Sequence, residues 1–349
     1  MAPVKWVYSF LKKYRFKMAA GLLMVTGIAL LTIVNPYISG RIVDDVITGG
    51  NYKLLPVLIG CLLGVVALKG ILRYASQVMF EICSQGVLYS MRDAVYRKLL
   101  QEDFSFYNKN RTGDLMSRQT GDMDAIRHFI AYIIYSVYEN ILLLSFALIM
   151  IFTVNVKLAL AMLVVLPFTA LTTYGQSKSV RPAFMKIRQQ FSSLNTFVQE
   201  NISGNRVVKA FAREDFEIEK FNKENDAYRD AELNAAAIWK KYVPIFEFLS
   251  NILTVVLMLY GGYMVIQGEI TMGNLVTVNG YLWMLTVPLR MAGWWINDIH
   301  RFTTSAEKIY TTYSQEPEIQ EPQQPIVRKH FHGDVEFKNV SYQAEDADI

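Results

Sequence analysis

The chain alternates between long apolar stretches and long polar segments. Six stretches are long and apolar enough to cross a bilayer, which takes about 20 residues each. These predicted spans are Met18–Ile38, Leu54–Val78, Phe129–Phe152, Leu158–Gly175, Val243–Ile266 and Leu275–Ile299. In the polar segments, apolar positions such as Leu194, Phe197 and Val198 recur three or four residues apart, which predicts helix there too. The pattern therefore predicts an all-α membrane protein built on a six-helix bundle.

The connections between the predicted spans are very unequal in length. Residues 79–128 and 176–242 are long connections, whereas 39–53, 153–157 and 267–274 are short. Both long connections fall on one side of the bundle, together with the N-terminus. That side carries 29 of the 35 Lys and Arg residues, so the positive-inside rule predicts that it is cytoplasmic.

Each long connection is predicted to be a helical hairpin that extends a pair of spans into the cytoplasm. We expect the turns where glycine occurs, at Asn110–Asp114 in the first segment and Ser203–Asn205 in the second. Two projecting helical hairpins are unusual for a channel. They suit a protein that receives a mechanical input from the cytoplasmic side.

The N-terminal residues 1–17 are predicted to form a separate helix in the membrane interface. Val7, Phe10, Leu11 and Tyr14 share one helical face, and basic residues surround it. A merely basic leader is the alternative. No small-residue cleavage site follows, which argues against a secretory signal peptide. The transmembrane domain is then expected over residues 18–313.

The C-terminal region changes in character. Residues 314–332 are polar and contain three prolines, which is typical of a domain linker. In residues 333–349, Val335 and Phe337 alternate with charged residues, which predicts the first strand of another domain. Because one strand cannot fold alone, we interpret the chain as part of a longer protein.

Composition narrows the possible functions. Hydrophobic residues make up 52% of the chain and charged residues 19%, which argues against a disordered or ordinary soluble protein. The net charge of +4 is too small to indicate a nucleic-acid partner, and two cysteines give no disulfide framework. The sequence contains no phosphate-binding G-x-x-x-x-G-K-[ST] run and no H-E-x-x-H, and its four histidines are dispersed. We therefore assign no catalytic residue and no metal site.

Polar and charged side chains inside the predicted spans are the candidate functional residues. Charges facing lipid cost a few kcal/mol, so we expect them to face the interior of the bundle. Lys69 and Arg73 share the second span, and Arg290 and Asp298 share a face of the sixth. The candidate cavity residues are Glu139, Asn140, Glu247, Asn251, Arg290, Trp294 and Asp298. Interhelical pairing and contact with a substrate both remain open for each charge, as do packing and cavity lining for the aromatic residues.

Several segments, taken in order, resemble the transmembrane domain of an ATP-binding-cassette (ABC) exporter of the bacterial half-transporter kind. Phe106-Tyr107 with Arg111 to Arg118 resembles the family's first intracellular loop, and Glu200 to Phe211 resembles the second. Ile270 to Leu275, leading to Pro288-Leu289-Arg290, is similar to the approach to the sixth helix. Gly333 to Tyr342 resembles the opening strand of the nucleotide-binding domain.

The resemblance implies a dimer of half-transporters in a bacterial inner membrane. It implies that ATP and Mg bind to nucleotide-binding domains, which coupling helices at the hairpin tips contact, and that the bundle alternates between inward-facing and outward-facing states. The substrate would be a drug, a lipid or a peptide-like molecule. The implied contacts with the ATPase domain are Arg111, Thr112, Gly113, Asp114, Leu115, Ser117, Arg118, Gly204, Asn205, Arg206, Val207, Lys209 and Phe211.

One position departs from the family pattern. Members place an aromatic residue that stacks on adenine two positions after the one occupied here by Tyr342, and this chain has Ala344 there. Tyr342 is the nucleotide-binding candidate that remains, and the departure favours a degenerate site in a heterodimer. The alternatives to an exporter are a six-span channel, which would need a selectivity filter or an arginine-repeat sensor that the sequence lacks, and a membrane sensor or scaffold.

Overall fold

The computed structural model describes residues 2–317, 330 and 333–340, and the regular elements in these residues are helices. The α-helices are α1 Ala2–Leu11, α2 Arg15–Arg41, α3 Leu55–Gln101, α4 Phe104–Lys109, α5 Thr112–Ser117, α6 Met123–His128, α7 Ile134–Val154, α8 Val156–Leu163, α9 Val165–Ser203, α10 Asn205–Ala210, α11 Glu214–Val256, α12 Gly262–Ile266 and α13 Met272–Ser314. Short 3₁₀ and π turns connect some of them, namely η1 Lys12–Tyr14, η2 Ile42–Thr48, η3 Tyr52–Leu54, η4 Arg118–Asp122, η5 Phe129–Ile133 and η6 Leu257–Gly261.

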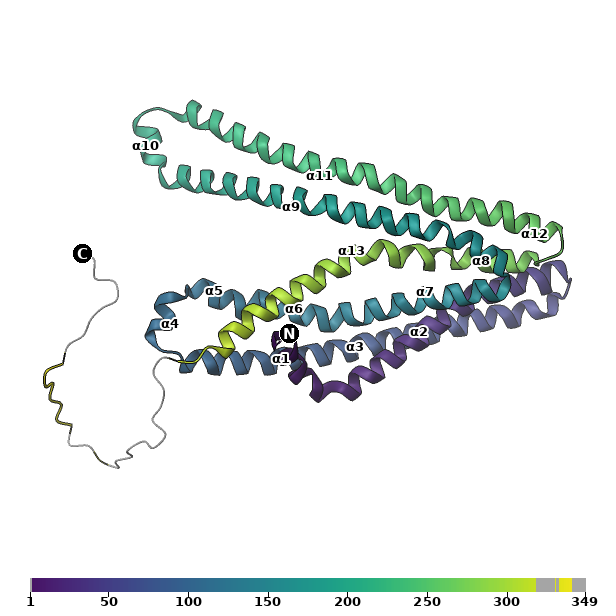
Figure 1. Ribbon diagram of the computed structural model, residues 1–349, viewed down its shortest axis with the longest axis horizontal. Helices are drawn as coiled ribbons and strands as arrows, with labels where there is room; N and C mark the ends of the chain where they lie inside the picture. Colours follow the sequence, from purple (N-terminus) through teal and green to yellow (C-terminus); the bar gives the residue numbers. More distant parts are fainter. Residues whose placement is uncertain (1, 318–329, 331–332, 341–349) are drawn as a thin grey trace.

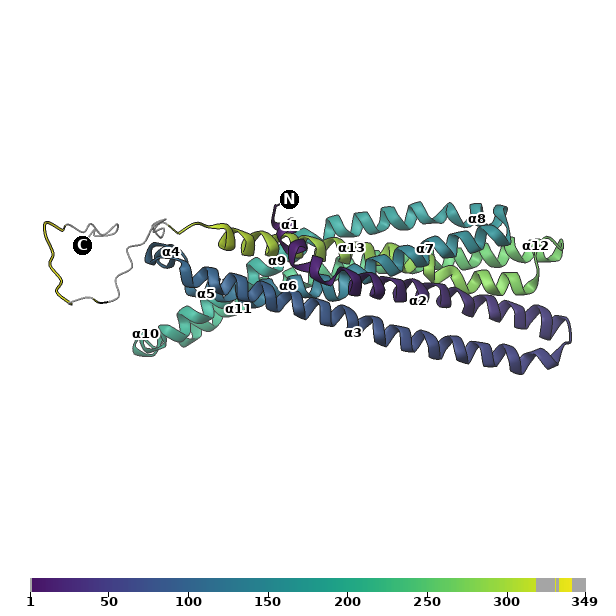
Figure 2. The ribbon, with the colours of Figure 1, turned by 90° about the horizontal axis from the view of Figure 1, so that it is seen from below.

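The helices form two elongated hairpins joined by α13 (Figure 1). The first hairpin runs out along α3 and returns through α6 and α7, with α4 and α5 at its tip. The second runs out along α9 and returns along α11, with α10 at its tip, and α9 and α11 pack against each other along their length. The α10 tip lies apart from α4 and α5 in both views (Figure 2). Helix α13 packs against α2, α7 and α9, so it ties the two hairpins together.

Five helical segments are long and apolar enough to cross a membrane. They are Ala2–Thr48, Tyr52–Gln101, Thr112–Val154, Val156–Ser203 and Glu214–Ile266. The sixth predicted span lies within α13, which is long enough but mixes its apolar residues with Asn, Gly, Thr and Trp. The chain is thus a multi-pass membrane protein with an all-α bundle. A sixth span in α13 stays a prediction.

Two apolar clusters hold the helices together. The outer cluster joins α2, α7 and α13 to α8, α9 and α11, and the inner cluster joins α1, α2, α3, α6, α7 and α13. The outer cluster surrounds Tyr281, whose hydroxyl donates a hydrogen bond of 3.0 Å to the carbonyl oxygen of Ile33. The inner cluster contains Phe80, Met91 and Ile126 and reaches the part of α13 around Phe302. Lipid tails are as apolar as these side chains, so in the outer cluster close packing and hydrogen bonds provide the stabilisation.

Helices α2 and α13 meet in a close contact at the short-loop end of the bundle. A β-carbon on Gly40 or on Gly273 would overlap the backbone of the other helix, so only glycine permits this separation. The carboxylate of Asp44 accepts hydrogen bonds from the Gly273 N–H at 2.7 Å and from the Thr271 hydroxyl at 2.6 Å. This carboxylate thereby satisfies a free N–H group in the first turn of α13.

The N-terminal helix α1 is followed by the 3₁₀ turn η1, and residues 15–17 of the predicted N-terminal helix belong to α2. The apolar face of α1 is covered by protein. Val7 is buried, and Phe10, Leu11 and Tyr14 pack into the inner cluster. Trp6 adds ring contacts with Tyr310 and Tyr313 of α13. The predicted apolar face therefore holds α1 on α13 and α3. The location of residues 1–17 in the membrane interface stays a prediction.

The predicted strand does not form in residues 333–340. The backbone there has no regular secondary structure, and Val335 and Phe337 are 79% and 80% exposed. A strand is stabilised by pairing with another strand, and the described part of the chain offers none. The predicted linker lies mostly outside the described residues, and Tyr342 and Ala344 lie entirely outside them.

Candidate functional site

The most strongly polar site inside the predicted spans lies between α3 and α7. Arg73 donates two hydrogen bonds to the Glu139 carboxylate, from Nη1 to Oε2 at 2.6 Å and from Nη2 to Oε1 at 2.5 Å. The side chain of Glu139 is only 10% exposed and that of Arg73 31%. Such a bidentate pair is among the stronger polar contacts in proteins. For Glu139, the structure thus shows interhelical pairing.

Helical periodicity positions the side chains of this site. Lys69, Arg73 and Gln77 follow one another at four-residue spacing and therefore share a face of α3. On α7, Glu139 lies one turn from Tyr135 of the inner cluster and one turn from Leu143 of the outer cluster. The ion pair therefore sits where the two apolar clusters meet.

These side chains line a cavity of about 370 Å³. Its walls come from α2, α3, η5, α7 and α13, and the lining residues are Thr32, Lys69, Arg73, Gln77, Tyr132, Tyr135, Ser136, Glu139, Asn140, Leu143 and Trp283. Among the described residues Lys69 has no ion-pair partner, so the cavity holds one cation more than it has anions. It can therefore accept a polar or anionic group. Two of the predicted cavity residues, Glu139 and Asn140, line this cavity.

The other predicted cavity residues lie on α11 and α13, away from this cavity. Arg290 borders a small cavity of about 50 Å³, together with Thr169, Phe246, Ser250, Thr286 and Leu289. Glu247, Asn251 and Trp294 are exposed and Asp298 is half-buried. Within the described part of the chain, Glu247, Arg290 and Asp298 form no ion pair. Among the described residues, no helix covers the faces of α11 and α13 that carry Glu247 and Arg290, and their place in a cavity stays a prediction.

The cavity residues that sequence reasoning missed are mostly uncharged. Thr32, Gln77 and Ser136 are common in helices, and nothing in a single sequence distinguishes a lining residue of this type from a packed one. The sequence pattern that could have identified this cavity is the four-residue spacing of Lys69, Arg73 and Gln77. It marks a polar face within a predicted span, and such faces turn away from lipid.

The tip of the first hairpin presents α5 outward. Arg111, Thr112, Gly113, Asp114 and Ser117 are exposed there, so their side chains are available to a partner. Two of the predicted contact residues, Leu115 and Arg118, are instead engaged within the chain. Leu115 is buried inside the hairpin, because it is the apolar position that anchors this short helix. Arg118 donates a hydrogen bond to the hydroxyl of Thr312 on α13, so its guanidinium group already has a partner within the chain.

Contacts with α13 also hold the return arm of the first hairpin. The Ser305 hydroxyl donates a hydrogen bond of 2.7 Å to Asp122, and the Lys308 ammonium lies 3.8 Å from the same carboxylate. Asp122 belongs to η4, which directly follows α5. The first tip and the end of α13 are therefore mechanically connected.

The second tip presents α10, also outward. Asn205, Arg206, Val207, Lys209 and Phe211 are exposed, and Gly204 is half-buried. The Lys209 ammonium lies 3.0 Å from Glu214 at the start of α11, which closes the turn. The pKa of Glu214 is lowered, first by hydrogen bonding to its own backbone N–H and then by Lys209.

The tight turn of the second tip is made by a residue other than the predicted glycine. Gly204 has φ −90° and ψ 5°, which any residue can adopt. The left-handed residue is Ala212, with φ 47°. Gly113 lies inside α5 and also has no positive φ. The two turns lie close to the predicted positions. The expectation that Gly113 and Gly204 make these turns tight was wrong, because neither has a positive φ.

Long apolar helices, two projecting hairpins and exposed short helices at the tips define a polytopic helical membrane domain of the transporter type. Residues 18–289 match the family described as the ABC transporter transmembrane region. The chain belongs to this family.

Relatives agree with the family match. The chain is 36% identical to the uncharacterized ABC transporter ATP-binding protein YknU of Bacillus subtilis. The aligned region covers 96% of this chain and 56% of YknU. It is 25% identical to the ATP-dependent lipid A-core flippase of Syntrophus aciditrophicus, over 96% of this chain and 55% of the flippase. It is also 25% identical to the multidrug resistance-like ATP-binding protein MdlA of Escherichia coli, over 99% of this chain and 58% of MdlA. The chain spans about half the length of these curated relatives.

Proposed function

We propose that the chain is the membrane half of an ATP-driven exporter that alternates between inward-facing and outward-facing states. The proposal is supported by the family match and by relatives whose names include a lipid A-core flippase and a multidrug resistance-like protein. The substrate class proposed is a drug, a lipid or a peptide-like molecule. The protein would work in a bacterial inner membrane with its hairpin tips in the cytoplasm.

The observation that carries the proposal is the continuity of the helices between the spans and the tips. Helix α3 has 47 residues and α11 has 43, so at about 1.5 Å per residue they extend roughly 70 and 65 Å. Neither is interrupted by a loop, so a displacement of the tip displaces the span. Exposed residues of α5 and α10 would receive that displacement from nucleotide-binding domains that bind ATP and Mg.

A second half-transporter is the proposed partner in the membrane. Glu247 and Arg290 are charged, exposed in the single chain and located within predicted spans. Such side chains are costly when they face lipid, which supports a second subunit on these faces of α11 and α13. A cavity shared by two subunits would then contain Glu247, Asn251, Arg290, Trp294 and Asp298.

Cysteine crosslinking tests the proposed coupling in the full-length protein. The native Cys61 and Cys83 are first replaced, and Ser117→Cys on α5 is combined with single cysteines on the ATPase domain. We expect a nucleotide-dependent crosslink from Ser117→Cys and none from Ser192→Cys, an exposed position about 18 Å back along α9 from α10. Failure of Ser117→Cys to crosslink in every nucleotide state would favour the sensor or scaffold alternative.

A further inference from the structure

One face of α9 is exposed along most of its length and changes character in a fixed order. We call it the outer stripe of α9. Its residues, three or four positions apart, are Phe168, Leu171, Tyr174, Lys178, Arg181, Met185 and Arg188. The opposite face carries buried Thr169 and Thr173, and Ser179, whose hydroxyl lies 3.2 Å from that of Tyr242 on α11. The outer stripe is therefore the face that α11 leaves uncovered.

The order of residues along the stripe follows the layers of a bilayer. Phe168 and Leu171 are apolar and lie in the predicted fourth span, and Leu171 is 66% exposed. Tyr174 is 70% exposed and stands at the end of that span, where aromatic residues commonly mark the membrane boundary. Lys178 and Arg181 follow immediately. This order is typical of a helix face that meets lipid.

Distances along the helix place two of the basic residues at the level of the headgroups. Lys178 and Arg181 lie about 6 and 10 Å beyond Tyr174, at about 1.5 Å per residue. The headgroup layer is roughly 5–8 Å thick on each side, so Lys178 lies within it. Arg181 lies just beyond it and reaches it with its long side chain. Arg188 lies about 21 Å beyond Tyr174, which is outside that layer.

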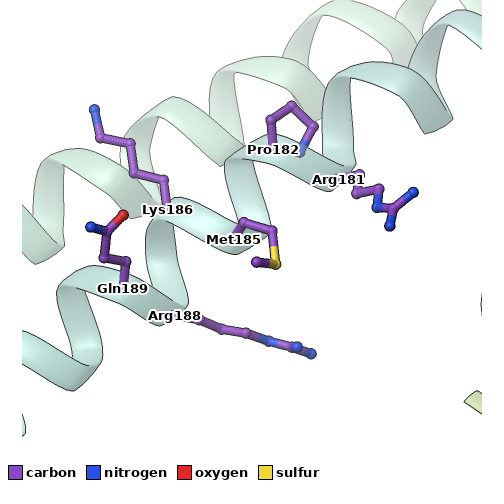
Figure 3. Close-up of a pocket in the computed structure, with 6 residues that line it drawn as sticks. All are labelled: Arg181, Pro182, Met185, Lys186, Arg188 and Gln189. Carbon is purple, nitrogen blue, oxygen red and sulfur yellow. The ribbon is translucent and has the colours of Figure 1, made fainter. Parts of the chain in front are cut away.

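The stripe carries positive charge that no acidic residue nearby neutralises. Residues 158–199 contain no Asp or Glu. Among the described residues, Lys178, Arg181 and Arg188 form no ion pair. Arg181 and Arg188 extend from the same side of α9 with Met185 between them, whereas Lys186 points to the other side (Figure 3). The surface around them is an open depression lined by residues of α9 alone.

We propose that Lys178 and Arg181 bind the phosphate groups of anionic phospholipids in the leaflet on the hairpin side of the membrane. The apolar part of the stripe lies against the acyl chains, Tyr174 marks the boundary, and the two cations contact the headgroups. Basic residues next to the cytoplasmic end of a membrane helix attract anionic lipid, and each contributes about a fivefold change in affinity. The proposal does not depend on transport, because lipid binding needs neither ATP nor a substrate.

Native mass spectrometry of the full-length protein tests the proposal, with phosphatidylglycerol as the probe and phosphatidylcholine for comparison. We expect K178Q/R181Q to weaken phosphatidylglycerol binding about thirtyfold and to leave phosphatidylcholine binding unchanged. The matched control is K186Q/R188Q, which removes the same charge from the same helix farther from the membrane. We expect it to change the affinity less than threefold. The charge-conserving variant K178R/R181K should retain binding, which separates loss of charge from loss of fold.

Four outcomes would overturn the proposal. The first is unchanged phosphatidylglycerol binding in K178Q/R181Q. The second is an equal loss in both double variants, which would indicate a general charge effect. The third is displacement of phosphatidylglycerol by inorganic phosphate at the same concentration as the lipid, which would indicate a site for a soluble anion. The fourth is efficient disulfide formation between two copies of Met185→Cys, which would place a second subunit on the stripe.

Discussion

Arg73 on α3 and Glu139 on α7 are joined by two parallel hydrogen bonds of 2.6 and 2.5 Å, across 66 positions of the chain. The pair connects the two arms of the first hairpin at the level where the inner and outer apolar clusters meet. It therefore fixes both the separation and the rotation of the two helices. Both residues also line the cavity of about 370 Å³ beside the pair.

Breaking this ion pair should destabilise the protein more than removing it completely. We expect Arg73→Met or Glu139→Leu alone to lower the free energy of unfolding by roughly 2–3 kcal/mol, because each leaves a charge largely out of water. The double variant should recover most of that loss. Thermal unfolding of the purified full-length protein measures the effect. Lys157→Met, which breaks an exposed pair with Glu269, is the control and should cost less than about 1 kcal/mol.

The contact between α2 and α13 should not tolerate a β-carbon. Gly40→Ala would place a methyl group against Thr277 and the carbonyl oxygen of Gly273. We expect a loss of about 2 kcal/mol or more, because two helix backbones must separate. Gly60→Ala, in open space on α3, should instead be neutral or stabilise by up to about 1 kcal/mol. Equal melting temperatures for the two variants would contradict the close contact.

The turn at the second tip should become less strained with glycine. Ala212 has φ 47°, and the left-handed conformation costs a residue with a β-carbon about 1 kcal/mol. We therefore expect Ala212→Gly to stabilise the tip by roughly 0.5–1 kcal/mol. Ala236→Gly, at an exposed position inside α11, should destabilise by about 1 kcal/mol. Hydrogen exchange of the amides in residues 205–217 measures the first effect, and faster exchange in Ala212→Gly would count against it.

Arg290 provides a test of the proposed shared cavity. On the proposed function, Arg290→Ala should reduce substrate-stimulated ATP hydrolysis of the full-length protein several-fold, whereas Arg290→Lys should retain most of it. The control is Arg301→Ala, an exposed position on the same helix beyond the predicted span. If Arg290→Ala changes neither transport nor stimulated hydrolysis, the role of Arg290 is structural.

Sequence patterns predicted the elements well because they are local properties. The apolar stretches and the three- and four-residue spacing gave the helices, and the polar segments gave both hairpin tips within a few residues. Residues 333–340 have no regular secondary structure, and the opening strand of another domain stays a prediction, since a strand depends on a partner and not on alternation alone. The prediction that Gly204 makes the second turn was also wrong, because the residue in the left-handed conformation is Ala212.

The site was less predictable than the fold. Glu139 and Arg73 were both expected to avoid lipid, but their pairing depends on how α3 and α7 rotate about their own axes. Leu115 and Arg118 lie in the predicted coupling segment, yet one is buried and the other bonds to α13. Whether a tip residue faces outward depends on which neighbour occupies its other side, and that neighbour is distant in sequence.

By itself, the sequence determined that this protein is a helical membrane domain with two projecting hairpins, because hydropathy and helical periodicity act over one or two turns. Only the tertiary structure decided that Arg73 pairs with Glu139, that Asp44 contacts the start of α13, and that the outer stripe of α9 is left uncovered. Each of these depends on the relative rotation and separation of whole helices. Those quantities are fixed by packing between residues far apart in the chain.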